Sequence, residues 1–345
     1  GRGKGKESRE RKIEIIKNSA LYDSQEHYIY WARFTWWGGQ SITFPLNPNP
    51  HLYSDKDLPT QGKAIINFSQ KFLKENPTFE GIYVDSLYRW GEFYNLRVEH
   101  FRYADIPLTY TPKDQRMPYG VVFKAEEYMP AIKNEFSHIE LLRELREILH
   151  KQGKLLAANG VTKGRFFDAV LLDVLIVEGC RADISLCRFY RTCAYQKPFL
   201  RLCMQHEQTN VKEYIEVCTL YGIFPGSHDY EGYVKRNCDL LAKYLPLIKI
   251  ISAAGWEPIT YASSSDMDVL VERFGKDYGN EFYFTLYNPT EKDKDVTIEV
   301  EVEKLGIKRI SSVKELVTEK RMPCTPKISL RIPKKSLRIL RICSC

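Results

Sequence analysis

Between residues 61 and 250, short apolar runs alternate with longer segments in which apolar residues fall on one face. A helix is predicted over 61–74, because its apolar residues recur at helical spacing. The run 81–84 then predicts a buried strand that ends at Asp85. Strands that alternate with helices predict a parallel sheet joined by right-handed crossovers.

The same pattern continues down the chain. Further helices are expected over 138–149, 165–172 (a short helix or turn), 184–194, 210–221 and 232–244, and further strands over 155–158, 174–177 and 199–204. Ser137 and Glu140 have the spacing of a capping box at the start of a helix. Short apolar strands that each end in a polar residue favour an α/β fold of the (β/α)8 TIM-type barrel over a doubly wound sheet.

After Gly255 the helical pattern gives way to alternating strands. Strands are expected over 269–273, 282–287, 296–302, 328–332 and 337–342. Such a series predicts an antiparallel β-sandwich. We therefore divide the chain into an irregular, aromatic N-terminal segment (1–60, with the charged residues 1–12 disordered), a barrel catalytic domain (61–255) and a C-terminal β-sandwich domain (256–345).

The barrel domain holds too few strands for a closed barrel. A complete barrel needs eight βα units and roughly 250 residues, whereas 61–250 supply four. Either 13–60 contribute further strands, or the first strands lie upstream of Gly1. We favour the second interpretation, in which the chain holds the C-terminal half of the barrel.

Composition and charge exclude some partners. Of the 345 residues, 43% are hydrophobic, yet no apolar run reaches the roughly 18–20 residues that span a bilayer, so we expect a soluble protein without a membrane partner. The net charge of +7 is concentrated near the two ends, but no aromatic and basic module accompanies it, so we expect no nucleic-acid partner. The localisation and the oligomeric state stay open, because an export signal upstream of Gly1 would not be visible.

Nine cysteines are present, six of them between Cys180 and Cys238. Their spacing does not form two CxxC knuckles, so a structural zinc site is not indicated. No glycine-rich phosphate loop or cluster of metal ligands is evident, and we expect no metal and no organic cofactor. An odd number of cysteines leaves at least one thiol unpaired, and the redox compartment stays open.

Two carboxylates follow predicted strands of the barrel domain, Asp85 and Glu178. The carboxyl ends of barrel strands form the active-site face, and glycoside hydrolysis requires two carboxyl groups there. We therefore predict that Asp85 and Glu178 are the catalytic residues. The alternative for each is a helix N-cap or a loop ion pair, because strand ends meet solvent.

Aromatic and polar residues near the same strand ends are candidates for substrate binding. Tyr88, Trp90 and Trp37 could stack on the apolar face of a sugar, although ordinary core packing is the competing interpretation. Asn159 and His206 could bind sugar hydroxyl groups. The stretch 222–227 is expected to form a loop over the site.

The sequence 81–86 (Gly-Ile-Tyr-Val-Asp-Ser), with Trp90 just after it, resembles the nucleophile strand of retaining glycosidases related to α-galactosidases and α-glucosidases. The resemblance covers roughly 61–300 and is to an uncharacterised, glycosidase-like branch of this superfamily. It implies that Asp85 is the nucleophile and Glu178 the acid/base, with Asn159 on the strand between them. Glu178 stands where these families more commonly have Asp.

The sequence thus predicts a retaining glycoside hydrolase that acts on an oligosaccharide or glycoside. One alternative is a non-catalytic carbohydrate-binding protein on a barrel scaffold. Another is a barrel enzyme of different chemistry, such as a phosphosugar isomerase or lyase, although no glycine-rich turn suited to a phosphate is present.

Overall fold

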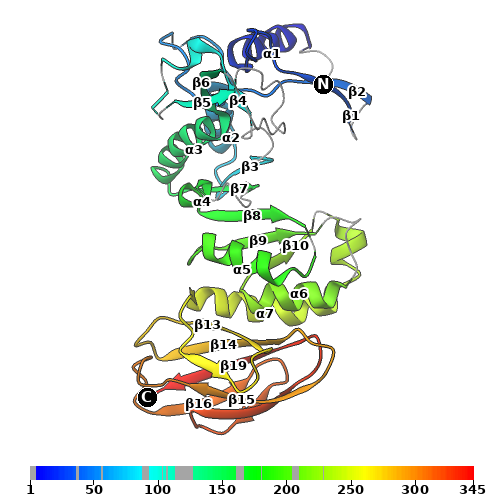
Figure 1. The fold of residues 1–345 in the computed structure, drawn as a ribbon, viewed down its shortest axis with the longest axis vertical. Coiled ribbons are helices and arrows are strands. Elements are labelled where there is room, and N and C mark those ends of the chain that lie inside the picture. Colours follow the sequence, from blue (N-terminus) through cyan, green and yellow to red (C-terminus); the bar gives the residue numbers. More distant parts are fainter. Residues whose placement is uncertain are drawn as a thin grey trace. The chain divides into compact units, whose positions relative to one another are not determined.

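A computed structural model shows a mixed α/β chain that divides into two compact units, unit 1 (Gly1–Asp173) and unit 2 (Val174–Cys345) (Figure 1). The structure describes residues 5–35, 39–55, 57–87, 93–102, 104–105, 108–112, 127–160, 167–179, 181–203, 210–227 and 229–345. The two units are described separately below.

Unit 1 combines helices with three small groups of strands. Its helices are α1 (Gly5–Ser19), α2 (Gln61–Glu75), α3 (Asn134–His150) and α4 (Asp168–Leu171), with a 3-10 turn at Val98–His100. Its strands are the antiparallel pair β1 (Trp31–Thr35) and β2 (Gly39–Thr43), the antiparallel group β4 (Tyr94–Asn95), β6 (Tyr128–Lys133) and β5 (Thr109–Pro112), and the parallel pair β3 (Gly81–Val84) and β7 (Leu155–Asn159). The expected disorder of 1–12 is wrong from residue 5 onward, because α1 begins there.

Helix α3 covers one face of the parallel pair. In β7, Leu156 and Ala158 are fully buried, as are Leu142 and Leu145 of α3, which contacts this strand. The alternate residues point to the opposite face, where Leu155 is 46% exposed. The strands therefore present a half-open face on the side away from the helix.

The predicted capping box at the start of α3 is wrong. The helix begins at Asn134, directly after β6, and the capping residue Lys133 makes no side-chain capping bond. The Ser137 hydroxyl, buried one turn into the helix, has no hydrogen-bond partner among the described residues. Glu140 instead accepts hydrogen bonds from Asn49 and from the backbone of Asp105, so distant contacts replace the local cap.

Unit 2 begins with three parallel strands in the order β8 (Val174–Glu178), β9 (Phe199–Leu202) and β10 (Phe224–Gly226). Helices α5 (Ile184–Cys193) and α6 (Val211–Leu220) connect them, and a π-helical turn (Tyr230–Val234) and α7 (Cys238–Ala254) follow. The described residues contain no closed ring of parallel strands. The mixture of helices with parallel and antiparallel strands agrees with the predicted α/β class, and the barrel itself stays a prediction.

Strand β10 corrects the expectation that 222–227 forms only a loop. Gly222, with a φ of 62°, ends α6 in a left-handed turn, and the next amide donates to Cys218 O at 2.8 Å. Pro225 lacks an N–H, but β10 pairs only with β9 among the described strands, so the unpaired edge tolerates a proline.

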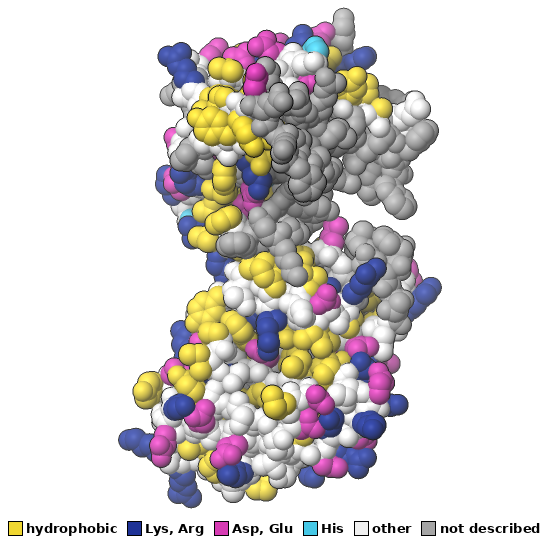
Figure 2. All heavy atoms as spheres, viewed as in Figure 1, with side chains coloured by type: hydrophobic (Ala, Val, Ile, Leu, Met, Phe, Trp, Pro, Cys, Tyr) yellow, Lys and Arg dark blue, Asp and Glu magenta, His cyan; other side chains and the backbone are white. Residues whose placement is uncertain are grey.

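The C-terminal part of unit 2 is an antiparallel sandwich, as the sequence predicts. One sheet has the order β11 (Trp256–Glu257), β13 (Leu270–Phe274), β14 (Glu281–Asn288), β19 (Ser336–Ser344), β16 (Ile310–Glu315) and β17 (Lys320–Met322); the other has β12 (Ala262–Ser264), β15 (Lys294–Val300) and β18 (Lys327–Ile332). Side chains such as Phe284, Ile298 and Leu340 fill the space between the sheets. Positive and negative side chains are interspersed over the face of the sandwich that Figure 2 shows.

Strand β14 is buried on both faces. Phe282, Phe284 and Leu286 point into the sandwich core. On the opposite face, the Thr285 hydroxyl donates to the carbonyl oxygen of Leu220 at the end of α6. Helices α6 and α7 therefore cover the outer face of this sheet (Figure 1).

Candidate functional site

The candidate site in unit 1 lies at the carboxyl end of the parallel strands β3 and β7. The pairing of these strands runs from Gly81 opposite Leu155 to Val84 opposite Ala158. One step further along the same register, Asp85 lies beside Asn159. Side chains that are opposite each other in a sheet share a face, so the register brings the two polar groups together.

Asn159 holds the backbone and the side chain of the Asp85 segment at once. Its amide nitrogen donates to Asp85 Oδ1 at 2.9 Å, and its amide oxygen accepts a hydrogen bond from the backbone N–H of Ser86. Asn159 is fully buried. A buried side chain with both ends engaged has little rotational freedom, so it fixes the direction of the Asp85 carboxylate.

Two hydroxyl groups also contact Asp85. Tyr83 donates from its hydroxyl to Asp85 Oδ1 at 3.2 Å, and Ser86 donates from Oγ to Asp85 Oδ2 at 3.1 Å. Ser86 has a φ of 57°, a left-handed conformation that is uncommon for residues other than glycine. The carboxylate nonetheless stays exposed, so a molecule from solvent can reach it.

A pocket of about 210 Å³ adjoins Asp85 within unit 1. Its walls come from the end of β3, from the starts of α2 and α3, and from the segment that precedes α2. Among its lining residues are Asp85, Ser86, Gln61, His138, Phe44 and Leu46. The mixture of apolar walls with a few polar groups is typical of small-molecule sites.

Glu178, the second predicted catalytic residue, ends β8 in unit 2. It lies opposite Leu202 in the parallel pairing with β9, and its side chain is exposed. Gly179, with a φ of 124°, turns the chain immediately after it and donates its N–H to the carbonyl oxygen of Leu202 at 2.8 Å. Both predicted carboxylates thus end parallel strands, but they belong to different units, and their facing each other stays a prediction.

Four of the predicted substrate-binding residues lie outside the described residues: Trp37, Tyr88, Trp90 and His206. Asn159 is described, and its amide group hydrogen-bonds at both ends with the Asp85 segment. The role of Asn159 as a direct sugar ligand stays a prediction.

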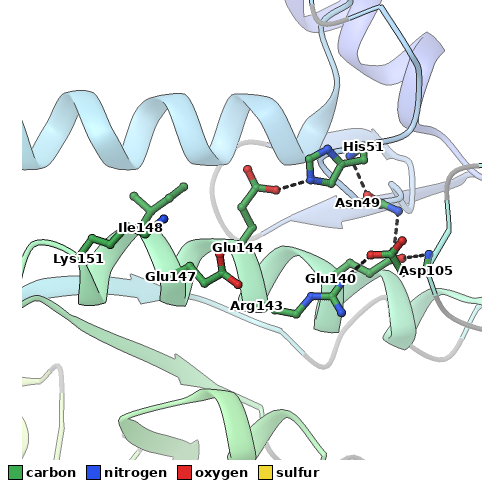
Figure 3. A pocket seen from close by; sticks show the side chains of 9 residues that line it. All are labelled: Asn49, His51, Asp105, Glu140, Arg143, Glu144, Glu147, Ile148 and Lys151. Carbon is green, nitrogen blue, oxygen red and sulfur yellow. Dashed lines mark hydrogen bonds and ion pairs between the residues drawn. The ribbon is translucent and has the colours of Figure 1, made fainter.

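A second pocket, of about 320 Å³, lies along α3 and escaped the sequence analysis (Figure 3). Glu140 lies at one end, 5% exposed, and accepts from Asn49 Nδ2 at 2.6 Å and from the backbone N–H of Asp105 at 2.7 Å. Burial is the largest influence on the Glu140 carboxyl and raises its pKa. His51 Nε2 lies 2.8 Å from Glu144 Oε2 on the next turn of the helix.

No local signal marks this second pocket. Asn49 and Glu140 are 91 positions apart, and Asn49 stands in a proline-rich stretch that is typical of a surface loop. The pocket combines carboxylates with Arg143 and Lys151. Side chains of both signs line this cleft, with carboxylates in excess, and they do not by themselves imply a particular ligand.

Two kinds of feature are missing from the part of the chain that the structure describes. It holds no group of three or more His, Cys, Asp or Glu side chains arranged to hold a metal ion. It also holds no helix with the length and apolar character needed to cross a membrane.

Comparison with known proteins gives similarity in structure alone. No protein-family model and no curated protein sequence matches the chain. A family 27 β-L-arabinopyranosidase from Geobacillus stearothermophilus is similar over 60% of this chain and 54% of that one, with 10% identity and a TM-score of 0.44. An α-amylase from Anoxybacillus is similar over 82% of this chain and 63% of that one, with 10% identity and a TM-score of 0.47.

A noncanonic maltogenic α-amylase from Thermotoga neapolitana is similar over 85% of this chain and 67% of that one, with 12% identity and a TM-score of 0.46. The chain therefore spans about half to two thirds of the length of these glycoside hydrolases. At such identities the substrates and mechanisms of these enzymes remain statements about those enzymes.

Proposed function

We propose that the chain belongs to a glycoside hydrolase that cleaves a glycosidic bond with two carboxyl groups, in which Asp85 is the nucleophile and Glu178 the acid/base. The observation that carries the proposal is the arrangement at Asp85. An exposed carboxylate at the carboxyl end of a parallel strand is held by a fully buried amide and by two hydroxyl groups.

The contacts of Asp85 suit an attacking carboxylate. A nucleophile must keep one oxygen directed at the anomeric carbon while the rest of the group stays fixed. Asn159 and Tyr83 both donate to Oδ1, whereas Oδ2 receives a single hydrogen bond from the described residues, from the Ser86 hydroxyl. Oδ2 is therefore the oxygen that we assign to attack, and Asn159 is the residue that orients it.

In the proposed reaction, Asp85 Oδ2 forms a bond to the anomeric carbon as the bond to the leaving oxygen breaks. Glu178 donates its proton to that oxygen, and the alcohol departs. Glu178 then takes a proton from water, whose oxygen attacks the anomeric carbon and releases Asp85. The sugar retains its anomeric configuration because two inversions have occurred.

The remaining parts of the site belong to the same proposal. Tyr88, Trp90 and Trp37 would stack on the sugar, and His206 would bind a hydroxyl group. A barrel-type catalytic domain over 61–255 would carry the site, and the sandwich domain over 256–345 would follow it.

The experiment measures hydrolysis of a panel of aryl glycosides by the purified chain and its variants. Asp85→Ala should lower turnover by ~10³-fold or more, because no other group can form the intermediate. Glu178→Ala should slow substrates with poor leaving groups far more than those with good ones, because only poor leaving groups need the acid. Azide added to Asp85→Ala should give a glycosyl azide of inverted configuration.

A matched control is Asp57→Asn, an exposed carboxylate of unit 1 outside the site, which should keep the wild-type rate. Wild-type rates in both the Asp85 and the Glu178 variants would contradict the proposal. If the chain binds sugars without turnover, and Asp85→Asn binds them equally well, the alternative of a non-catalytic carbohydrate-binding protein would replace it.

A further inference from the structure

The pocket beside Asp85 has apolar walls that the proposed reaction does not explain. These walls come from the segment before α2, from the N-terminal halves of α2 and α3, and from the end of β3. The apolar lining side chains are Phe44, Leu46, Pro48, Ile65, Val84, Leu87 and Leu141. A sugar ring carries hydroxyl groups, and each needs a hydrogen-bonding partner once it leaves water. Walls of this kind offer few such partners.

The pocket is open to solvent, so a ligand can enter it. Four of its apolar side chains are only half-buried: Phe44, Leu46, Ile65 and Val84. Apolar area that stays in contact with water in a concave site is removed from water when an apolar group binds there. The pocket therefore favours an apolar occupant.

The volume of the pocket and its aromatic wall indicate the size and kind of this occupant. An apolar cavity of about 150 Å³ holds one benzene molecule, and this pocket measures about 210 Å³. The ring centroid of Phe44 lies 6.0 Å from that of Tyr30 and 6.4 Å from that of Tyr28. Aromatic rings prefer edge and offset contacts with further rings. A single aromatic ring therefore suits both the space and its wall.

The wall formed by 44–48 is fixed to both neighbouring helices. A Cβ atom at Gly62 would clash with the carbonyl oxygen of Pro48, so the first turn of α2 packs directly on this backbone. From α3, Asn134 Nδ2 donates to the carbonyl oxygen of Leu46 at 3.1 Å. The wall is thus in place before a ligand arrives, and binding does not have to order it.

Polar groups line the same pocket. Asp85 and Ser86 are among them, so an occupant lies beside the carboxylate segment that the proposed reaction uses. The backbone N–H of Gln61 donates to Ser19 Oγ at 2.8 Å, and its side-chain amide has no hydrogen-bond partner among the described residues. This amide is available to donate to an oxygen atom of a ligand.

We propose that this pocket binds the aglycone of the substrate, and that the substrate is a glycoside whose aglycone carries one aromatic ring rather than an oligosaccharide. The inference rests on the proposed function, because it places the aglycone beside the nucleophile Asp85. Phe44, Leu46 and Ile65 remove the ring from water and limit its size. A second sugar in the same place leaves hydroxyl groups without partners, so an oligosaccharide is the poorer substrate.

A binding measurement tests the pocket without any turnover. The ligand is 4-fluorobenzyl alcohol, followed by fluorine NMR in the presence of the purified chain. Its resonance should shift saturably, with a Kd on the order of 1 mM for so small a molecule, and excess benzyl alcohol should reverse the shift. In the wild-type chain, the ring protons of bound benzyl alcohol should give nuclear Overhauser effects to methyl groups of Leu46, Ile65 and Val84.

Variants that fill the pocket assign the binding to it. Ile65→Trp should weaken binding of 4-fluorobenzyl alcohol by about tenfold or more, because the indole takes the space of the ligand. Leu46→Trp fills the pocket from the segment before α2 and should have the same effect. The matched control is Phe68→Trp on the same helix as Ile65, at a side chain that is 66% exposed and does not line the pocket. This control should bind like the wild-type chain.

Kinetics connect the pocket with the reaction. A benzyl and a methyl glycoside of the same sugar release alcohols of similar acidity, so a difference between their rates reports binding of the ring. The benzyl glycoside should have a kcat/KM roughly 10–100-fold higher than the methyl glycoside or a disaccharide of that sugar. Ile65→Trp should remove this preference, whereas Phe68→Trp should keep it.

The outcomes separate this inference from the proposed function. Hydrolysis that depends on Asp85, with equal kcat/KM for the benzyl and methyl glycosides, would overturn the inference and leave the hydrolase proposal in place. Saturable binding that Ile65→Trp removes, in a chain without hydrolysis, would support the aromatic-ring pocket and contradict the reaction. Absence of saturable binding to the wild-type chain, or absence of the Overhauser effects to the pocket methyl groups, would overturn the assignment of the pocket whatever the rates.

Discussion

The sandwich of unit 2 and the body of unit 1 fill their interiors with different chemistry. Between the two sheets of the sandwich the buried cluster consists of apolar side chains such as Phe284, Ile298 and Leu340. In unit 1 many of the deepest groups are polar, among them Asn47, Asn95, His100, Asn134 and Asn159. The first interior is stabilised by area removed from water, and the second also depends on hydrogen bonds between its buried polar groups.

The group around His100 shows how the polar interior works. His100 is fully buried; its Nδ1 accepts from Asn95 Nδ2 at 2.9 Å, and its Nε2 donates to the carbonyl oxygen of Asn18 at 2.9 Å. Arg97 lies nearby and donates to the carbonyl oxygen of Lys17 at 2.6 Å. A neutral imidazole with a defined tautomer, at the end of the 3-10 turn, therefore ties α1 to β4.

The largest expected effect is the loss of an apolar group from the sandwich. Phe284→Ala should lower the free energy of unfolding by about 3–5 kcal/mol, because a fully buried ring is removed and its cavity cannot close. Chemical denaturation at pH 7 and pH 4 measures it, and the loss should be the same at both. Phe79→Ala, where the ring is 51% exposed, is the matched control and should cost about 1 kcal/mol. Equal losses of stability in the two variants would contradict the large contribution that burial gives to the apolar interior of the sandwich.

The next effect tests the polar interior through pH. Burial, and then the charge of Arg97, lower the pKa of His100 to about 3, against 6.5 for a free imidazole. Between these values the unfolded chain binds a proton that the folded chain does not, so stability falls as pH falls from 6.5 towards 3. From pH 7 to pH 4 the loss from this group should be about 3 kcal/mol.

Hydrogen exchange of peptides that cover 93–102 gives the local reading for this effect. Protection there should fall with pH in the wild-type chain after correction for intrinsic exchange. In His100→Gln the fall should be smaller, because no group at that position takes up a proton. A pH dependence that survives unchanged in His100→Gln would assign the effect elsewhere.

Much of the regular structure could be predicted from the sequence, because it is encoded locally. The strands β3, β7, β8 and β9 are apolar runs next to polar ends, and they form where expected. Strand β16 was not predicted. Its pairing shifts between Ile310 and Ser312, so a bulge breaks the alternation of buried and exposed residues that marks a strand.

Helix α7 was predicted to end at 244 but continues to Ala254 through Pro246. Tyr244, Ile248 and Ile251 keep one buried stripe across the proline, and this packing outweighs the lost backbone hydrogen bond.

In the candidate site, the sequence placed Asp85 and Asn159 at strand ends. Only the register of β3 with β7 shows that Asn159 binds the Asp85 segment.

The smallest expected effect concerns a single polar group at the border of the apolar interior. Glu272 is 3% exposed; its Oε2 accepts from Trp256 Nε1 at 2.9 Å, and its Oε1 lies 3.0 Å from a guanidinium nitrogen of Arg188. Glu272→Ala should cost about 2 kcal/mol, mainly because the buried indole N–H loses its partner. Glu272→Gln keeps an acceptor for the indole and should recover most of that loss.

The ion pair of Glu272 with Arg188 should couple by less than about 1 kcal/mol in a double-mutant cycle, because the Arg188 side chain is 57% exposed. Glu257→Gln, at a half-buried carboxylate beside Trp256, is the control and should cost under about 0.5 kcal/mol. If Glu272→Gln were as damaging as Glu272→Ala, the charge would matter more than the hydrogen bond, and this border would resemble the polar interior of unit 1.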